Sequence, residues 1–197
     1  MNEFIKSIKW FWIIKIINNN YYLSSILRYD RNIIKLIKKW ILETVNKNEI
    51  KFELLFKMSE NGTNSIDFHK YCDNKGPSLT LVKTTKNKIF GGFTPLSWNT
   101  EGKHIEDINN QTFIFSLNLK KKFNMIKKNE VGIYCSKDYG PRFGAGDFGL
   151  RENMKNGETY ANECCNFLSN NNLELTGGKG DNENFNTEEL EVYKVIY

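Results

Sequence analysis

The chain has 197 residues, of which 40% are hydrophobic and 14% aromatic, so it can bury the core of one domain and is short for two. Its net charge of +5 is uneven, because residues 145–197 carry four basic and ten acidic side chains while the rest of the chain is basic. This asymmetry fits an acidic partner or an anionic membrane, although most lysines stand singly beside asparagine and are expected to be solvated surface. No run of Lys and Arg is interleaved with aromatics as in an RNA-binding signature, so we expect no nucleic acid partner.

The first apolar stretch is FIKSIKWFWIIKII, at residues 4–17. It has 14 residues and contains three lysines, whereas a membrane-spanning helix needs about 20 mostly apolar residues. It also lacks the small-residue cleavage site of a signal peptide. We therefore predict a helix or strand that packs on its own protein. Two alternatives stay open, an interfacial segment whose tryptophans lie in a membrane surface and a membrane anchor.

A helix is predicted over residues 33–45, where IIKLIKKWILETV places apolar residues at helical spacing with lysines on the other side. Residues 1–50 are accordingly expected to form an N-terminal helical extension. Residues 52–57 are short and apolar, and the loop SENGTNS then leads into a short predicted helix at residues 66–72.

From residue 78 the pattern becomes that of strands, which are short, rich in β-branched or aromatic residues, and separated by Asn, Gly, Lys and Asp. A tight hairpin turn is predicted at Lys86-Asn87. No segment between the strands has the length of a helical crossover, so the sheet is expected to be antiparallel. The predicted fold class is α+β, mainly β, as an antiparallel sandwich with a few peripheral helices. The predicted strands cover residues 78–85, 88–93, 112–118, 131–136 and 189–197.

The segment GAGDFG at residues 144–149 matches the dinucleotide-binding pattern G-x-G-x-x-G letter for letter. That pattern requires a strand directly before the glycines and a helix at the third one. Here SKDYGPRF intervenes after the strand, and Asn153, Asn156 and Gly157 follow where a helix should continue. We therefore predict that the glycines supply positive φ angles and close backbone approach, so that three aromatics pack inward. The glycines are Gly140, Gly144, Gly146 and Gly149, and the aromatics are Tyr139, Phe143 and Phe148.

The remaining reactive side chains form no recognisable catalytic or metal pattern. Cys72, Cys135, Cys164 and Cys165 lack the spacing of a disulfide framework, which favours a reduced cytosolic compartment and buried free thiols. Four possible zinc ligands are His69, Cys72, Cys164 and Cys165. We expect no zinc site, because the paired close-spaced ligands typical of such sites are absent. Glu188, Glu189 and Glu191 are expected on the solvent side of the final strand. We expect no catalytic residue, no metal and no cofactor.

Six motifs in order resemble the TLDc domain. The stretch at residues 51–77 also resembles the entry to that domain, so the resemblance covers residues 51–197. It implies a sandwich of two antiparallel sheets with flanking helices. The motifs are KGPSLTLVKT (75–84), IFGGFTPLSW (89–98), TFIFSL (112–117), IYCSKDYGPRFGAGD (133–147), LTGG (175–178) and F-x-x-EELEVYKV (185–195).

The resemblance implies a role in resistance to oxidative stress and, as in several eukaryotic relatives, binding to the vacuolar proton ATPase and regulation of its assembly. It implies a non-catalytic protein-interaction domain, which we expect to be a monomer in the cytoplasm or peripheral on endomembranes. Two alternatives stay open, a cysteine-dependent antioxidant enzyme and a membrane-surface adaptor that uses residues 4–17.

Positions that match the family motifs are the candidate interaction residues. Most are expected to maintain the fold, whereas Asp147 and Glu191 are expected on the surface, where they would hold the glycine-rich loop or contact a partner. The full set is Gly91, Gly92, Trp98, Tyr139, Gly140, Pro141, Phe143, Gly144, Gly146, Asp147, Glu189 and Glu191.

Overall fold

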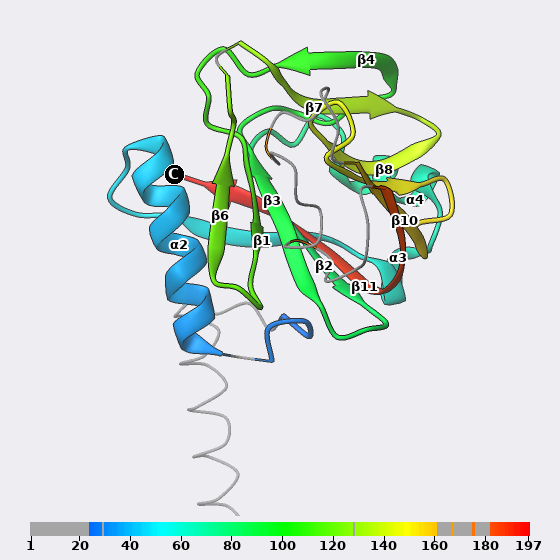
Figure 1. Ribbon diagram of the computed structural model, residues 1–197, viewed down its shortest axis with the longest axis horizontal. Helices are drawn as coiled ribbons and strands as arrows, with labels where there is room; N and C mark the ends of the chain where they lie inside the picture. The colour runs from blue at the N-terminus through cyan, green and yellow to red at the C-terminus, as the bar shows by residue number, and fades with distance from the viewer. Residues whose placement is uncertain (1–23, 29, 128, 161–166, 168–174, 176–181) are drawn as a thin grey trace, which may run out of the picture.

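The computed structural model describes residues 24–28, 30–127, 129–160, 167, 175 and 182–197 (Figure 1). The segment at residues 4–17, Cys164 and Cys165 lie outside these residues, so what the sequence indicates for them stays a prediction. Within the described part, the helices are α2 (Arg31–Val45), α3 (Met58–Asn61) and α4 (Ser65–Cys72). The strands are β1 (Lys51–Lys57), β2 (Ser78–Thr84), β3 (Ile89–Thr94), β4 (Glu101–Glu106), β5 (Phe113–Ser116), β6 (Lys121–Asn124), β7 (Val131–Ser136), β8 (Tyr139–Phe143), β9 (Phe148–Arg151), β10 (Asn156–Tyr160) and β11 (Asn182–Ile196).

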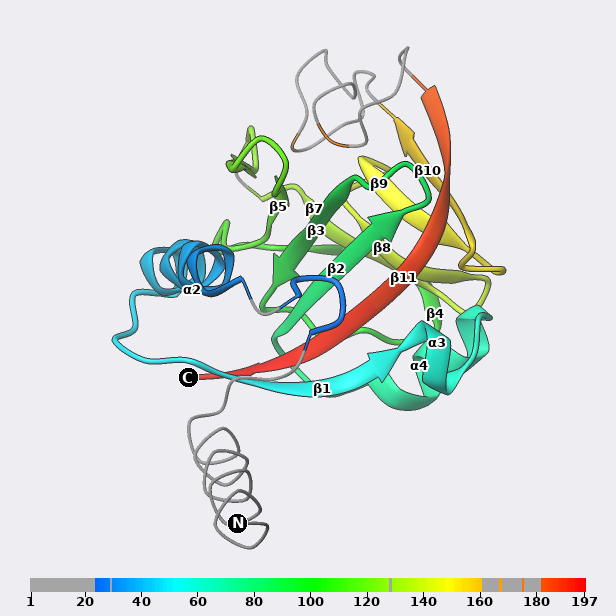
Figure 2. The ribbon, with the colours of Figure 1, turned by 90° about the horizontal axis from the view of Figure 1, so that it is seen from below.

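The strands form one antiparallel sheet in the order β4-β7-β8-β9-β10-β11-β2-β3-β5-β6, and β1 pairs with β11 beside this path. Strand β11 joins two layers, because residues 182–186 pair with β10 while residues 187–194 pair with β2. The first layer consists of β1, β2, β3, β5, β6 and the second half of β11, and the second layer consists of β4, β7, β8, β9, β10 and the first half of β11. Figure 2 shows this strand running along the whole length of the sandwich. The expected fold class, α+β and mainly β, is confirmed. The two layers share backbone hydrogen bonds through β11, so the sheet is continuous.

The first core lies between the two layers and is built from aromatic rings. Phe90 of β3 packs edge-on against Phe148 of β9 at 5.4 Å and against Phe185 of β11 at 5.2 Å. Phe143 of β8 stacks on Phe148 at 4.9 Å. These rings are almost fully buried, so each removes a large apolar area from water, and together they hold the layers face to face.

The second core lies on the outer face of the first layer, beneath α2. The helix begins after Asp30, whose side chain accepts hydrogen bonds from the backbone N–H groups of residues 32 and 33, and it ends at Asn46 in the left-handed conformation. Its apolar stripe, which includes Trp40 and Ile41, packs on the sheet, and the Trp40 and Phe115 rings lie 5.9 Å apart. The helix predicted over residues 33–45 is confirmed. The domain boundary at residue 50 stays a prediction, although α2 shares this core with the strands.

The predicted strands correspond to β2, β3, β5, β7 and the second half of β11, and the predicted hairpin turn joins β2 to β3. The helix predicted at residues 66–72 is α4. Strands β1, β4, β6, β8, β9 and β10 escaped prediction, and β1 was recognised only as a short apolar stretch. They are short and contain Gly, Pro or charged residues, as in EGKHIE of β4 and YGPRF of β8. Hydrogen bonding to neighbouring strands keeps these segments extended, where their own residue preferences do not.

Candidate functional site

The GAGDFG segment forms the turn of a β-hairpin. Phe143, the last residue of β8, pairs with Phe148, the first residue of β9, and the residues between them make the turn. Gly144 and Gly146 have φ angles of 65° and 141°, as predicted for the loop. A strand follows the glycines instead of a helix, so the loop lacks the helix N-terminus on which dinucleotide binding depends.

Four of the candidate residues are buried in the core, as expected: Gly91, Gly92, Trp98 and Phe143. Trp98 is buried, donates from its indole Nε1 to Ser78 Oγ at 2.9 Å, and packs against Phe143 at 5.5 Å. A Cβ atom at Gly91 would lie 1.9 Å from the carbonyl oxygen of Thr80, and one at Gly92 would lie 2.5 Å from the Phe143 ring. Gly92 and Trp98 therefore let Phe143 of β8 pack closely against the first layer, whereas Gly91 leaves room for the backbone of the neighbouring strand β2.

The remaining part of the YGPRF motif divides between the two faces of its layer. Gly140 and Pro141 are buried, and a Cβ atom at Gly140 would meet the Met154 sulfur at 2.7 Å. Tyr139 was expected to pack inward, which is wrong, because its half-buried ring lies beside Arg142 on the outer face. A register shift between Tyr139 and Arg142 in the pairing with β9 brings these two side chains to the same face.

The expectation that Asp147 lies on the surface is wrong. Its side chain is fully buried beneath the β8–β9 turn, and its Oδ1 accepts the backbone N–H of Phe167 at 2.8 Å. The sequence suggested that this acid would hold the glycine-rich loop by accepting its backbone N–H groups, whereas the N–H group bound here belongs to Phe167, outside the loop. This bond gives the buried carboxylate a donor and joins Phe167 to the turn.

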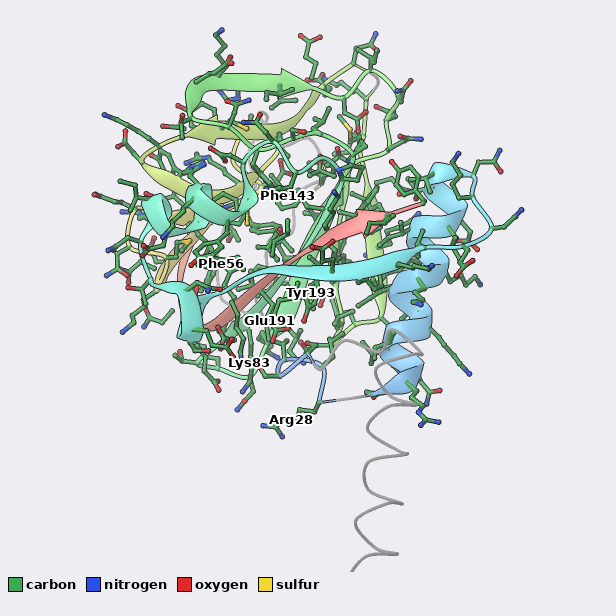
Figure 3. The ribbon with its side chains drawn as sticks, turned by 180° about the vertical axis from the view of Figure 1, so that it is seen from behind. Arg28, Phe56, Lys83, Phe143, Glu191 and Tyr193 are labelled. Atoms are coloured by element: carbon green, nitrogen blue, oxygen red, sulfur yellow. The ribbon has the colours of Figure 1, made fainter. Side chains whose placement is uncertain are left out.

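Glu191 was also expected on the surface and is buried, with 1% of its area exposed. Its Oε1 accepts from the backbone N–H and the hydroxyl of Ser25, at 2.9 and 2.8 Å. Its Oε2 accepts from the hydroxyls of Ser24 at 2.5 Å and Tyr193 at 2.8 Å. A carboxylate with this many donors can be buried, because they replace its hydration. Figure 3 shows Glu191 and Tyr193 together on β11.

Glu189 is half-buried and holds the start of α3, since its Oε1 accepts the backbone N–H of Ser59 at 3.1 Å. Glu189 and Glu191 therefore fix chain segments that reach the sheet from residues 24–25 and 58–61. Asp147 belongs to the turn between β8 and β9 in the other layer. The structure does not bring Asp147, Glu191 and the glycine loop together on one exposed patch.

A different set of side chains meets on the outer face of the second layer, and we call it the arginine ladder. Arg142 on β8 donates from Nη1 to Glu158 on β10 at 3.0 Å, across strand β9. Gly149 stands between them, paired with both residues. A Cβ atom there would lie 2.8 Å from Arg142 Cγ, so the missing side chain lets the arginine cross the strand. Arg151 completes the ladder by donating from Nε to Glu158 at 2.8 Å.

The other end of the arginine ladder is aromatic. The Arg142 guanidinium lies over the Tyr139 ring at 4.6 Å and over the Tyr134 ring at 5.6 Å. Tyr134 in turn contacts Tyr139 at 5.9 Å and His104 at 4.7 Å. The ladder thus runs from His104 on β4 to Arg151 on β9 and Glu158 on β10, over adjacent strands of one face.

Sequence reasoning selected only Tyr139 from the arginine ladder. Arg142 lies inside the YGPRF motif, and the third glycine of GAGDFG is Gly149. The motifs therefore contained two of the residues on which the ladder depends. Strand β10, which carries Glu158, was not predicted as a strand. Without the pairing of β8, β9 and β10, the contact between Arg142 and Glu158 cannot be read from the sequence.

The residues considered as zinc ligands have other roles. His69 lies with Nδ1 2.7 Å from Asp73 Oδ1 and Nε2 2.9 Å from the carbonyl oxygen of Ser136, which fixes α4 to the end of β7. Cys72 and Cys135 are buried free thiols, as predicted. Burial raises the pKa of Cys135 to about 11 and raises the pKa of Cys72 further. Among the described residues, no group of three or more His, Cys, Asp or Glu side chains is placed to hold a metal ion.

In the part of the chain that the structure describes, no helix has both the length and the apolar character needed to cross a membrane.

Comparison with known proteins places these features in a family. The sequence pattern of the TLDc domain matches residues 24–196. Over 66 residues the chain is 33% identical to the MTOR-associated protein MEAK7 of Danio rerio. This aligned stretch covers 34% of this chain and 14% of that protein. The match therefore spans about one seventh of the length of this relative.

Proposed function

Because the chain belongs to the TLDc domain family, we propose that it is a non-catalytic protein-interaction domain that binds the vacuolar proton ATPase and acts in resistance to oxidative stress. Regulation would follow from preferential binding to one assembly state of the pump, since a ligand shifts an equilibrium by its difference in affinity for the two states. We place this role in the cytoplasm or on the cytoplasmic face of endomembranes.

The observation that carries the proposal is the arginine ladder. Tyr and Arg are the side chains most enriched at the energetic centres of protein interfaces, because they combine a large contact area with polar contacts. In the ladder these side chains are held before a partner arrives, since Arg142 is fixed by Glu158 on one side and by Tyr139 on the other. A preformed surface loses less conformational entropy on binding.

A cysteine-dependent antioxidant enzyme is the second candidate from the sequence. Such an enzyme needs an accessible thiol with a lowered pKa, because the thiolate is the nucleophile. Cys72 and Cys135 are buried and their pKa values are raised, which weighs against these two positions. The non-catalytic proposal is therefore the better supported one.

The test uses the purified full chain immobilised as bait and the purified soluble sector of the vacuolar proton ATPase, with and without ATP. We expect binding by the natural chain and at least a tenfold loss with Tyr134→Ala, whose half-buried ring lies in the ladder. The matched control is Lys39→Ala on the exposed side of α2, on the other layer, which should bind normally. Thermal unfolding of each variant shows whether the fold is retained.

Each outcome has a defined meaning. If the natural chain does not bind the pump sector with or without ATP, the partner is wrong. If Tyr134→Ala binds as well as Lys39→Ala, the pump is a partner but the ladder is not the surface. The same bait probed for MTOR tests whether the association named for the Danio rerio relative extends to this chain.

A further inference from the structure

One end of the domain, distinct from the arginine ladder, combines basic side chains with an apolar cavity. The turn between β2 and β3, the turn between β5 and β6, and the start of α2 lie together at the lower end of Figure 1, and Figure 2 looks onto this end. A cavity of about 460 Å³ opens among them. Its lining is mainly apolar and includes Ile26, Leu27, Ile89 and Leu117 beside Arg28 and Asn118.

The two turns are fixed to one another by Asn118. Its Oδ1 accepts the backbone N–H of Ile89 at 2.7 Å, and its Nδ2 donates to the carbonyl oxygen of Asn87 at 3.5 Å. The backbone N–H of Leu117 donates to the carbonyl oxygen of Ile89 at 2.9 Å. Because of these bonds, the lysines on the two turns form one surface.

We call the basic side chains around this cavity the basic rim. They come from three parts of the chain, and most are exposed. Figure 3 shows Arg28 and Lys83 at this end. Two acidic side chains lie among them, but Asp30 caps α2 and Glu188 pairs with Lys83 at 2.5 Å. The rim consists of Arg28, Arg31, Lys86, Lys88, Lys120 and Lys121.

An apolar side chain projects from the same end. Leu119, between Asn118 and the lysines of the β5–β6 turn, is 51% exposed. Exposed leucine beside lysine is the combination that suits a membrane interface, where lysine meets lipid phosphate and leucine enters the acyl boundary.

We propose that the basic rim and Leu119 dock this domain on a membrane surface rich in anionic phospholipid. The lysines and arginines bind headgroup phosphates, Leu119 enters the apolar region just below, and the mainly apolar cavity faces that region. This surface is separate from the arginine ladder, so the domain can lie on a membrane while the ladder stays open to a protein partner.

The experiment measures sedimentation of the full chain with vesicles of phosphatidylcholine alone or mixed with about one third phosphatidylserine. The test variant is Lys120→Gln with Lys121→Gln. The matched control is Lys103→Gln with Lys137→Gln, which removes the same charge from the other layer. We expect binding to the anionic vesicles that weakens with salt. The loss should be about fivefold per rim lysine, hence about 25-fold for the test pair.

Hydrogen–deuterium exchange on the vesicle-bound full chain locates the contact. Protection of residues 86–88 and 117–121 supports the proposal. Equal binding by the two double variants overturns it, as does protection confined to residues 1–23 or to the arginine ladder. Absence of binding to anionic vesicles also overturns it, and binding of an acidic protein that needs Lys120 and Lys121 would then assign the rim to that protein. None of these outcomes depends on binding of the proton pump.

Discussion

The carboxylate of Glu158 on β10 is bound by the guanidinium of Arg142 on β8, 3.0 Å away across the intervening strand β9. The contact exists because Gly149 leaves no side chain between them. The third glycine of the GAGDFG segment therefore has a structural role: it leaves room for the Arg142 side chain to cross strand β9.

Gly149→Ala is expected to lower the free energy of unfolding by about 1–2 kcal/mol, because the new Cβ displaces the Arg142 side chain from Glu158. Urea denaturation measures the change. In an Arg142→Ala background the same substitution should cost well under half as much, since the two closest atoms, Cγ and Cδ of Arg142, are removed. An equal cost in both backgrounds would show that Gly149 is needed for another reason.

Gly92→Ala is expected to destabilise the domain by about 1–3 kcal/mol, because its Cβ would lie 2.5 Å from the Phe143 ring. A side chain can yield, so Phe143→Leu should recover part of the loss. Gly91→Ala should be more damaging and should not be recovered in this way, because its Cβ meets the Thr80 carbonyl oxygen of the backbone. Thermal unfolding compares the two glycine variants, each with and without Phe143→Leu, and Phe143→Leu alone. Recovery of Gly91→Ala by Phe143→Leu would contradict the packing described.

Glu191→Gln is expected to cost about 2–4 kcal/mol, because the amide cannot accept at both positions where the carboxylate oxygens receive donors. Glu188→Gln is the matched control on the same strand and should cost at most about 1 kcal/mol, since that side chain is 47% exposed. Amide exchange adds a local readout. The N–H of Ser25 should exchange faster in Glu191→Gln, and unchanged exchange would mean that Glu191 does not hold this segment.

The Tyr193 hydroxyl is expected to lose its contribution to stability as the pH rises above about 10. Burial and the neighbouring Glu191 carboxylate raise the pKa of Tyr193 in the folded chain. Between the unfolded and folded pKa values the unfolded chain binds fewer protons, so the free energy of unfolding falls with rising pH. The measured quantity is the difference in this free energy between the natural chain and Tyr193→Phe, which should shrink above pH 10. A difference that stays constant would refute the raised pKa.

Cys135 is expected to resist alkylation and peroxide in the folded chain at neutral pH. With its pKa raised to about 11, the thiolate is a minor species there, and burial restricts access further. Mass spectrometry after iodoacetamide treatment should find Cys72 and Cys135 labelled only in denaturant. Rapid labelling of either thiol in the native chain would revive the antioxidant enzyme as a candidate.

Local patterns predicted the elements whose own residues decide their structure. Helix α2 has a cap, an apolar stripe and a lysine face, and strands such as β2 and β5 are rich in apolar and β-branched residues. Segments such as NGETY of β10 carry no such pattern. They become strands because their neighbours supply hydrogen bonds, so they could not be found one segment at a time.

The sequence by itself determined the family, the mainly β class and the need for glycine at position 144, since motifs, periodicity and turn chemistry are all local. Only the tertiary structure decided where the charges lie. Glu191 looked like a solvent-facing position of a final strand, yet this strand is covered by residues 24–27, whose serines bind the carboxylate. Arg142 and Glu158 lie in strands that are not neighbours, and their contact depends on the pairing of three strands. Burial and electrostatics depend on which distant segments meet, and folding fixes that arrangement.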